Sequence, residues 1–292
     1  MTPEEMVSRL LYRDGLMLVI DKPAGLAVHR GPNGGASLED HFDALRFGLP
    51  RPPALAHRLD RDTSGCLILG RHRKALAQLG RLFKNGAIDK TYWAVVEGGP
   101  DADEGTIEFP LGRLDVTRGW WMKHDPKGQP AVTRWKVLGR SSRTTSPCRG
   151  EVDLPKAGRV GVSDRPTSPE SPHPAGFAVE PPPAGEGKML SWLALEPVTG
   201  RTHQLRVHCA EMGWPILGDT IYGTARRNGG LILHLHAHEI VVPLYKNRAP
   251  IRISAPVPQH MHAWLAQCGW EGEDTPAPVI PGPKRSEGAR NP

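Results

Sequence analysis

The chain reads HRLDRDTSG from His57 to Gly65 and continues at once with the apolar run CLIL at residues 66–69. A short apolar run that follows turn residues predicts a buried strand. The charged loop before this strand is then held rigid at one end, as the loops that carry catalytic side chains often are. A solvated turn, in which aspartate and hydroxyl groups only bend the backbone, explains the same pattern. Other parts of the chain must decide between the two interpretations.

Composition and charge favour a folded protein with a polyanionic partner. The chain has 292 residues, of which 38% are hydrophobic, so it can form one large domain or two small ones. A net charge of +6 and a pI of about 9.3 make nucleic acid the leading partner class. We find neither a signal peptide nor a run approaching about 18 apolar residues. We therefore expect a cytoplasmic protein that does not bind membranes.

The cysteines are far apart, and none has the paired spacing of a disulfide framework or a zinc cluster. This spacing predicts reduced thiols in a reducing compartment. The cysteines are Cys66, Cys148, Cys209 and Cys268.

Hydrophobic patterns predict a sheet-rich chain with a few helices. We expect strands at residues 16–20, 66–69, 90–96, 106–109, 131–138, 189–195, 233–238 and 240–242. We expect a short helix opened by Ser37 and longer helices over residues 71–85, from the N-cap Thr202 to the stop at Gly213, and over 260–268. Residues 141–188 are rich in Pro, Gly and Ser, and this composition predicts a flexible insertion. The similar composition of residues 271–292 predicts a disordered tail.

The helix over residues 71–85 carries basic side chains without acidic partners. No Asp or Glu occurs between Thr63 and Ile88. The pattern indicates a stripe that contacts phosphates, although an ordinary exposed helix face has a similar composition. The basic residues are Arg71, Arg73, Lys74, Arg81 and Lys84.

Three histidines alternate with apolar residues between Leu233 and His238, which places the imidazoles on one strand face. A zinc site is one interpretation. Ligands spaced along one face lie about 7 Å apart, too far for a single tetrahedral ion to bind all three. We therefore expect hydrogen-bonded histidines at the edge of the core and no bound metal.

Six stretches resemble, in order, the motifs of the RNA pseudouridine synthases, and in particular their RluA-like branch. They read DKPAGL at 21–26, HRLDRDTSG at 57–65, KTY at 90–92, TGRTHQLRVH at 199–208, PILGD at 215–219 and LHA at 235–237. The resemblance implies an α+β fold with a mixed, largely antiparallel central sheet, flanking helices and a central active-site cleft. It also implies a stand-alone catalytic domain over residues 1–270.

The resemblance further implies a cofactor-free isomerisation of specific uridines in structured ribosomal or transfer RNA. In this hypothesis Asp60 is the catalytic carboxylate, which attacks or stabilises C1′ as the N1–C1′ bond breaks. Arg206 pairs with Asp60 and keeps it ionised. Tyr92 is the ring against which the uracil packs. Asp62 is left with a structural role in the turn. Whether Asp60 acts by a covalent or a glycal-type pathway stays open.

A buried uridine must leave its helix to enter such a cleft. The resemblance assigns Arg58 to the vacated space, where a guanidinium can stack on the neighbouring base. His57 is expected to support the site, and the enzyme to act as a monomer. Phosphate contacts are expected from Lys22, Lys90, Arg71 and Arg201. A catalytically inactive RNA-binding protein and a uracil-releasing glycosidase are the alternative functions.

Overall fold

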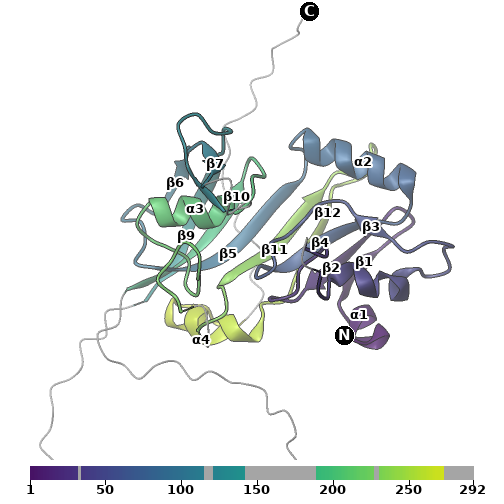
Figure 1. Ribbon diagram of the computed structural model, residues 1–292, viewed down its shortest axis with the longest axis horizontal. Helices are drawn as coiled ribbons and strands as arrows, with labels where there is room; N and C mark the ends of the chain where they lie inside the picture. The colour runs from purple at the N-terminus through teal and green to yellow at the C-terminus, as the bar shows by residue number, and fades with distance from the viewer. Residues whose placement is uncertain (32–33, 115–120, 142–188, 227–229, 273–292) are drawn as a thin grey trace, which may run out of the picture.

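A ten-stranded sheet forms the centre of the molecule (Figure 1), described here from a computed structural model. The structure describes residues 1–31, 34–114, 121–141, 189–226 and 230–272. The expected insertion 141–188, apart from Ser141, and the expected tail, apart from residues 271–272, lie outside this description. Ser141 and Leu190, which flank the insertion, are hydrogen-bonded to each other, so β9 and β10 remain sheet neighbours.

The strands run in the order β1-β2-β4-β11-β5-β10-β9-β6, with β12 paired to β11 and β3 to β4. Each of these pairs is antiparallel except β4–β11, as the resemblance predicts for a mixed, largely antiparallel sheet. The ten strands are β1 (Leu10–Arg13), β2 (Met17–Lys22), β3 (Ala54–Leu55), β4 (Ser64–Gly70), β5 (Asp89–Glu97), β6 (Glu104–Ile107), β9 (Thr133–Arg140), β10 (Leu190–Pro197), β11 (Leu235–Val242) and β12 (Ile251–Ser254). A separate hairpin consists of β7 (Leu111–Arg113) and β8 (Met122–His124).

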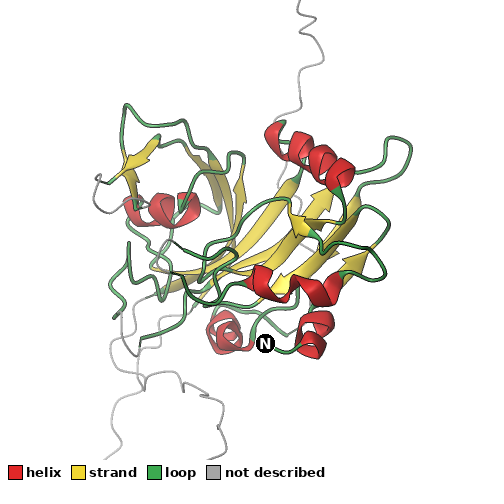
Figure 2. Ribbon diagram, turned by 45° about the vertical axis from the view of Figure 1, so that its right-hand side comes forward, coloured by secondary structure: helices red, strands yellow, loops and turns green. Residues whose placement is uncertain are grey.

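Helices pack on both faces of the sheet (Figure 2). Side chains alternate along β5, so that Ala94 and Val96 pack with α3 (Gln204–Glu211), whereas Trp93 and Val95 pack with α4 (Gln259–Gln267). The other half of the sheet is covered by α1 (Pro3–Ser8), the 3-10 helix η1 (Leu38–Leu45) and α2 (Arg73–Lys84). None of the helices in the described ranges has the length and apolar character needed to cross a bilayer.

The N-terminus of α3 differs from the prediction. His203, and not Thr202, is the N-cap residue, and its φ of 52° lies in the left-handed region. Gly213 follows the helix with a φ of 82°, as the predicted stop signal requires. The shift by one residue places the His203 ring at the start of the helix, where it faces the cleft described below.

Two of the three histidines near β11 are hydrogen-bonded as predicted, and the third, His238, stacks on Trp93 with ring centroids 3.7 Å apart. His234 contacts the carbonyls of Ile232 and His260, while His236 contacts Ser64 and the carbonyl of Ala255. Within the described ranges, no three histidine, cysteine or acidic side chains are placed to hold a metal ion. Cys66, Cys209 and Cys268 are buried free thiols, and Cys148 lies outside the described residues.

Candidate active site

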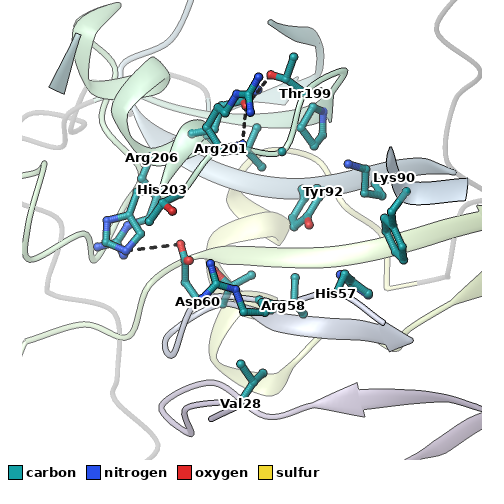
Figure 3. A pocket seen from close by; sticks show the side chains of 18 of the residues that line it. Val28, His57, Arg58, Asp60, Lys90, Tyr92, Thr199, Arg201, His203 and Arg206 are labelled. Carbon is teal, nitrogen blue, oxygen red and sulfur yellow. Dashed lines mark hydrogen bonds and ion pairs between the residues drawn. The ribbon is translucent and has the colours of Figure 1, made fainter. Parts of the chain in front are cut away.

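A cleft of about 990 Å³ opens across the sheet, and three of the segments that line it carry the predicted site residues (Figure 3). The first segment is the HRLD loop before β4, the second is the start of β5, and the third is the loop that leads into α3. These segments are far apart in the sequence. The side chains that line the cleft and that the sequence predicts to be functional are His57, Arg58, Asp60, Lys90, Tyr92, Arg201 and Arg206.

Asp60 lies in a turn that the core holds at both ends. The preceding Leu59 is buried, and the amide of Thr63 donates a 3.2 Å hydrogen bond to the carbonyl of Asp60. The next residues enter β4, whose side chains are buried throughout. The Asp60 side chain itself is 29% exposed. The carboxylate therefore stands on a rigid support and is accessible from the cleft.

Lys22 is buried beneath this loop and does not contact solvent. Its Nζ donates 2.8 Å hydrogen bonds to the carbonyls of Pro23, Arg61 and Thr63, three acceptors that match the three N–H groups of an ammonium. Burial lowers the pKa of Lys22 to about 7, and the nearby carboxylates oppose this shift. The prediction that Lys22 contacts phosphate is wrong, because the side chain is 0% exposed and holds the shape of the Asp60 loop.

Tyr92 enters the cleft from β5 between the two halves of the core (Figure 3). Its ring packs against the apolar cluster around α3 and against the cluster around η1. Burial raises the pKa of the Tyr92 hydroxyl well above its usual value, and the charge of Asp60 raises it further. The phenol is therefore protonated at neutral pH. Lys90 lies two residues earlier on the same strand face, and burial lowers its pKa.

The structure corrects the predicted partner of Arg206. Its guanidinium donates from Nε and Nη2 to the two carboxylate oxygens of Asp219, each at 2.7 Å, and makes no such bond to Asp60. Asp219 is 1% exposed, so this buried carboxylate needs a fixed cation, and the guanidinium fork matches both of its oxygens. Burial lowers the pKa of Arg206, but the hydrogen bonds and charge of Asp219 raise it above its usual value, and the charge of Asp60, which lines the same cleft, adds to this rise.

Asp219, which binds Arg206, and Tyr222, which contacts His203, were not predicted from the sequence to have a role in the site. Tyr222 accepts a hydrogen bond from the amide of Met122 and contacts Nδ1 of His203 at 2.8 Å. The opposite nitrogen of His203 lies 3.9 Å from Oδ2 of Asp60. The PILGD motif could have indicated a role for Asp219, its last residue, whereas no sequence pattern pointed to Tyr222.

The remaining predicted residues divide into exposed and structural side chains. Arg58 and Arg201 are exposed at the cleft, and Arg201 also donates to the carbonyl of Pro130. His57 accepts a 3.0 Å hydrogen bond from the amide of Ile68, and burial lowers its pKa to about 3, so the ring is neutral. The neutral His57 ring therefore supports the site through its bond to the β4 backbone.

Arg71 is the second predicted phosphate contact that the structure reassigns. Its guanidinium donates to the backbone carbonyls of Asp14, Arg46 and Phe47. These bonds tie the start of α2 to two neighbouring loops. Arg71 is absent from the cleft lining and both of its terminal nitrogens donate to backbone carbonyls, so the structure supports a structural role for Arg71 in place of the expected phosphate contact.

Comparison with known proteins identifies the family. The sequence profile described as RNA pseudouridylate synthase matches residues 16–211, which include the Asp60 loop, Tyr92 and Arg206. The chain belongs to the RNA pseudouridine synthases. Like the named members of this family, the pseudouridine synthase described here is an isomerase that converts uridine to pseudouridine in RNA. This match and relatives that include ribosomal large subunit pseudouridine synthase C confirm the predicted family and its RluA-like branch.

Individual relatives extend over most of the synthase. An uncharacterised RNA pseudouridine synthase of Zymomonas mobilis is 36% identical over 256 residues, covering 87% of this chain and 95% of that protein. The ribosomal large subunit pseudouridine synthase C of Vibrio cholerae is 30% identical, covering 90% of this chain and 70% of that protein. The solved human RNA pseudouridylate synthase domain containing 4 has the same fold, with a TM-score of 0.63, 23% identity and coverage of 91% and 94%.

Proposed function

We propose that this synthase isomerises specific uridines in structured ribosomal or transfer RNA, with Asp60 as the catalytic carboxylate. The observation that carries the proposal is the position of Asp60. A partly exposed carboxylate stands on a buried turn in the cleft, near the Tyr92 ring and the Arg206 guanidinium. The name of the Vibrio cholerae relative supports ribosomal RNA as one substrate class.

The reaction rearranges one nucleotide without a net change in composition. The N1–C1′ bond breaks, uracil leaves as an anion, and C1′ becomes electron-poor. The ionised carboxylate of Asp60 either bonds to C1′ or stabilises it electrostatically. Uracil then turns within the cleft and C5 bonds to C1′, which releases the carboxylate of Asp60 wherever a bond to it had formed. The proton on C5 is then lost and N1 takes one up, so that the product is an isomer of uridine. No step needs an oxidant, a reductant or a cofactor.

Tyr92 and Arg206 support this chemistry in different ways. The Tyr92 ring provides a flat apolar surface for the detached uracil, which has to be held while it turns. The buried phenol stays protonated and adds no second negative charge beside Asp60. Arg206 does not bond directly to Asp60, but it lines the same cleft and its positive charge interacts with the charge of Asp60.

A uridine in a folded RNA reaches this cleft after flipping out of its stack, at a cost of a few kcal/mol. Arg58 is exposed at the cleft, and its planar guanidinium is suited to stacking on the base next to the gap. Lys90 and Arg201 line the same cleft and provide positive charge for the phosphates of the flipped nucleotide.

Asp60→Ala and Asp62→Ala form a matched pair for testing the proposal. Both carboxylates lie in the same loop, but Asp62 pairs with Arg61 and is absent from the cleft lining. RNA labelled with tritium at C5 of uridine releases the label when pseudouridine forms. We expect release by wild-type protein and by Asp62→Ala, and none by Asp60→Ala. Release by Asp60→Ala at the wild-type rate would refute the role of Asp60, and free uracil as the product would indicate a glycosidase.

A further inference from the structure

His203 faces Asp60 across the cleft from the start of α3 (Figure 3). Its Nε2 lies 3.9 Å from Oδ2 of Asp60. Among the residues that the structure describes, no other basic side chain has a nitrogen within 4.0 Å of that carboxylate. The φ of 52° at His203 is unfavourable for a residue with a Cβ atom, and such backbone conformations concentrate at functional sites. The surrounding packing therefore holds His203 in a backbone conformation that is unfavourable for it, with the ring toward Asp60.

Tyr222 determines which nitrogen of His203 carries the proton. The Tyr222 oxygen accepts a 2.9 Å hydrogen bond from the Met122 amide and lies 2.8 Å from Nδ1 of His203. The Met122 amide can only donate, so of these two partners only Nδ1 can accept the proton of the Tyr222 hydroxyl, and we assign Nδ1 as the acceptor. A neutral imidazole with an accepting Nδ1 carries its proton on Nε2. The Nε2–H group therefore points toward Asp60.

The surroundings of His203 favour the neutral ring. Burial lowers the pKa of His203, the charge of Arg206 acts in the same direction, and Asp60, Asp219 and Asp62 oppose the shift. The ring edge also packs against Tyr222, with centroids 5.5 Å apart. A neutral ring whose position and proton are both set by Tyr222 supplies an oriented N–H donor. It does not add a second full charge beside Arg206.

Arg206 does not occupy the hydrogen-bonding position at Asp60 that His203 faces. Both carboxylate oxygens of Asp219 occupy the Arg206 fork, so the guanidinium acts on Asp60 through charge and not through a hydrogen bond. The 3.9 Å separation at His203 is longer than a hydrogen bond. Catalytic hydrogen bonds are often long in a free enzyme and shorten when the substrate is bound.

We infer that His203 is a positioning residue for the reaction: its Nε2–H closes onto Asp60 when RNA occupies the cleft and orients the carboxylate toward C1′. Tyr222, which accepts a hydrogen bond from the Met122 amide, holds the His203 ring at Nδ1, the nitrogen opposite the one that faces Asp60. The inference rests on the proposed role of Asp60. It assigns to His203 a contribution to the chemical step and not to RNA affinity.

Two substitutions at His203 separate the two ring nitrogens. The amide of asparagine ends near the position of Nδ1, whereas that of glutamine extends to the position of Nε2 and keeps a donor toward Asp60. In single-turnover reactions with saturating RNA, we expect His203→Asn to slow conversion by about tenfold to a hundredfold. We expect His203→Gln to stay within a few-fold of wild type. RNA affinity, measured separately by filter binding, should be unchanged for both variants.

Tyr222→Phe tests the same contacts without altering the residue of positive φ. This variant removes the hydroxyl that sets the proton of His203, and we expect it to slow conversion several-fold at unchanged RNA affinity. Wild-type rates for His203→Asn and Tyr222→Phe would overturn the inference, as would equal slowing by His203→Asn and His203→Gln. Asp60→Ala assayed in parallel separates the two proposals. If that variant is active the role of Asp60 fails, whereas an inactive Asp60→Ala beside a normal His203→Asn refutes the role of His203 alone.

Discussion

Arg206 and Asp219 form a buried bidentate pair, with both hydrogen bonds at 2.7 Å and side chains 3% and 1% exposed. Asp219 also accepts from the amides of Ile221 and Tyr222, so its position fixes the start of the turn that carries the Tyr222 side chain. The pair joins α3 to that turn. It therefore holds together the wall of the cleft from which His203 faces Asp60.

Asp219→Ala should strongly destabilise the fold. It leaves the Arg206 guanidinium buried without its partner, and breaking a buried pair in this way costs about 3–5 kcal/mol. We expect a loss of this size in the free energy of unfolding from urea titrations. Asp103→Ala is the control, since Asp103 is 83% exposed in its pair with Arg140, and the loss there should stay under about 1 kcal/mol. Equal losses in the two variants would contradict the structural importance of the buried pair.

Gly65→Ala should be destabilising because β4 and β11 approach closely at this position. Gly65 has a φ of 104°, and a Cβ atom there would lie 2.3 Å from the carbonyl oxygen of Ala237. Gly80 provides a matched control on the exposed side of α2, where a Cβ atom has no neighbour within 4 Å. Gly80→Ala should raise the stability by about 0.5–1 kcal/mol. Thermal melting of both variants checks the prediction, and a tolerated Gly65→Ala would contradict the close approach.

Acidification from neutral pH should destabilise the fold through its buried histidines. Burial lowers the pKa of His57 and His236 to about 3 and that of His234 to about 4, below the unfolded value of 6.5. The unfolded chain therefore binds more protons below pH 6.5. The stability is fully present above that pH and is lost as the pH falls toward 4 for His234 and toward 3 for His57 and His236, by at most about 1.4 kcal/mol per pH unit for each ring.

Two carboxylates oppose this loss. Burial raises the pKa of Asp21 to about 6, so this group adds stability as the pH falls below that value, and burial raises the pKa of Glu196 as well. The three histidines outweigh them. Urea unfolding at pH 7.5, 6.5 and 5.5 measures the dependence, and His236→Asn should reduce its slope whatever its effect at pH 7.5. A free energy of unfolding that stays constant between pH 7.5 and 5.5 would show that these rings are not held neutral.

The basic face of α2 should contribute to RNA affinity near the cleft. Arg81 and Lys84 are exposed one turn apart, and Lys84 lines the cleft. We expect Arg81→Ala and Lys84→Ala each to weaken binding and to reduce the slope of log affinity against log salt by about one. Arg71→Ala is the contrasting variant, because Arg71 bonds to backbone carbonyls. It should lower stability and leave the salt slope unchanged. Filter binding across a salt series distinguishes these outcomes.

Apolar runs were sufficient to predict the main strands and the two longer flanking helices, since burial leaves a direct periodic pattern in the sequence. The expected strand at 66–69 is β4, and the expected helix over 71–85 is α2. The short elements α1, β1, β3, β7, β8 and β12 were missed. They contain two to six residues each, too few for a period to emerge.

The motifs were also sufficient to predict the family and to single out Asp60, Tyr92 and Arg206, which the fold brings to one cleft. They could not predict which charged group pairs with which. The sequence alone does not show whether a given lysine is buried or exposed. The carbonyls that hold Lys22 belong to its own and a distant segment.

The same limit explains why Arg206 was paired with Asp60 and not with Asp219, and why Tyr222 was overlooked. Composition and motifs specify the chemical groups that the chain contains. Only packing specifies which of them lose water together, and a group that loses its water must find a partner within hydrogen-bond distance. That choice of partners, made between segments far apart in the chain, belongs to the tertiary structure.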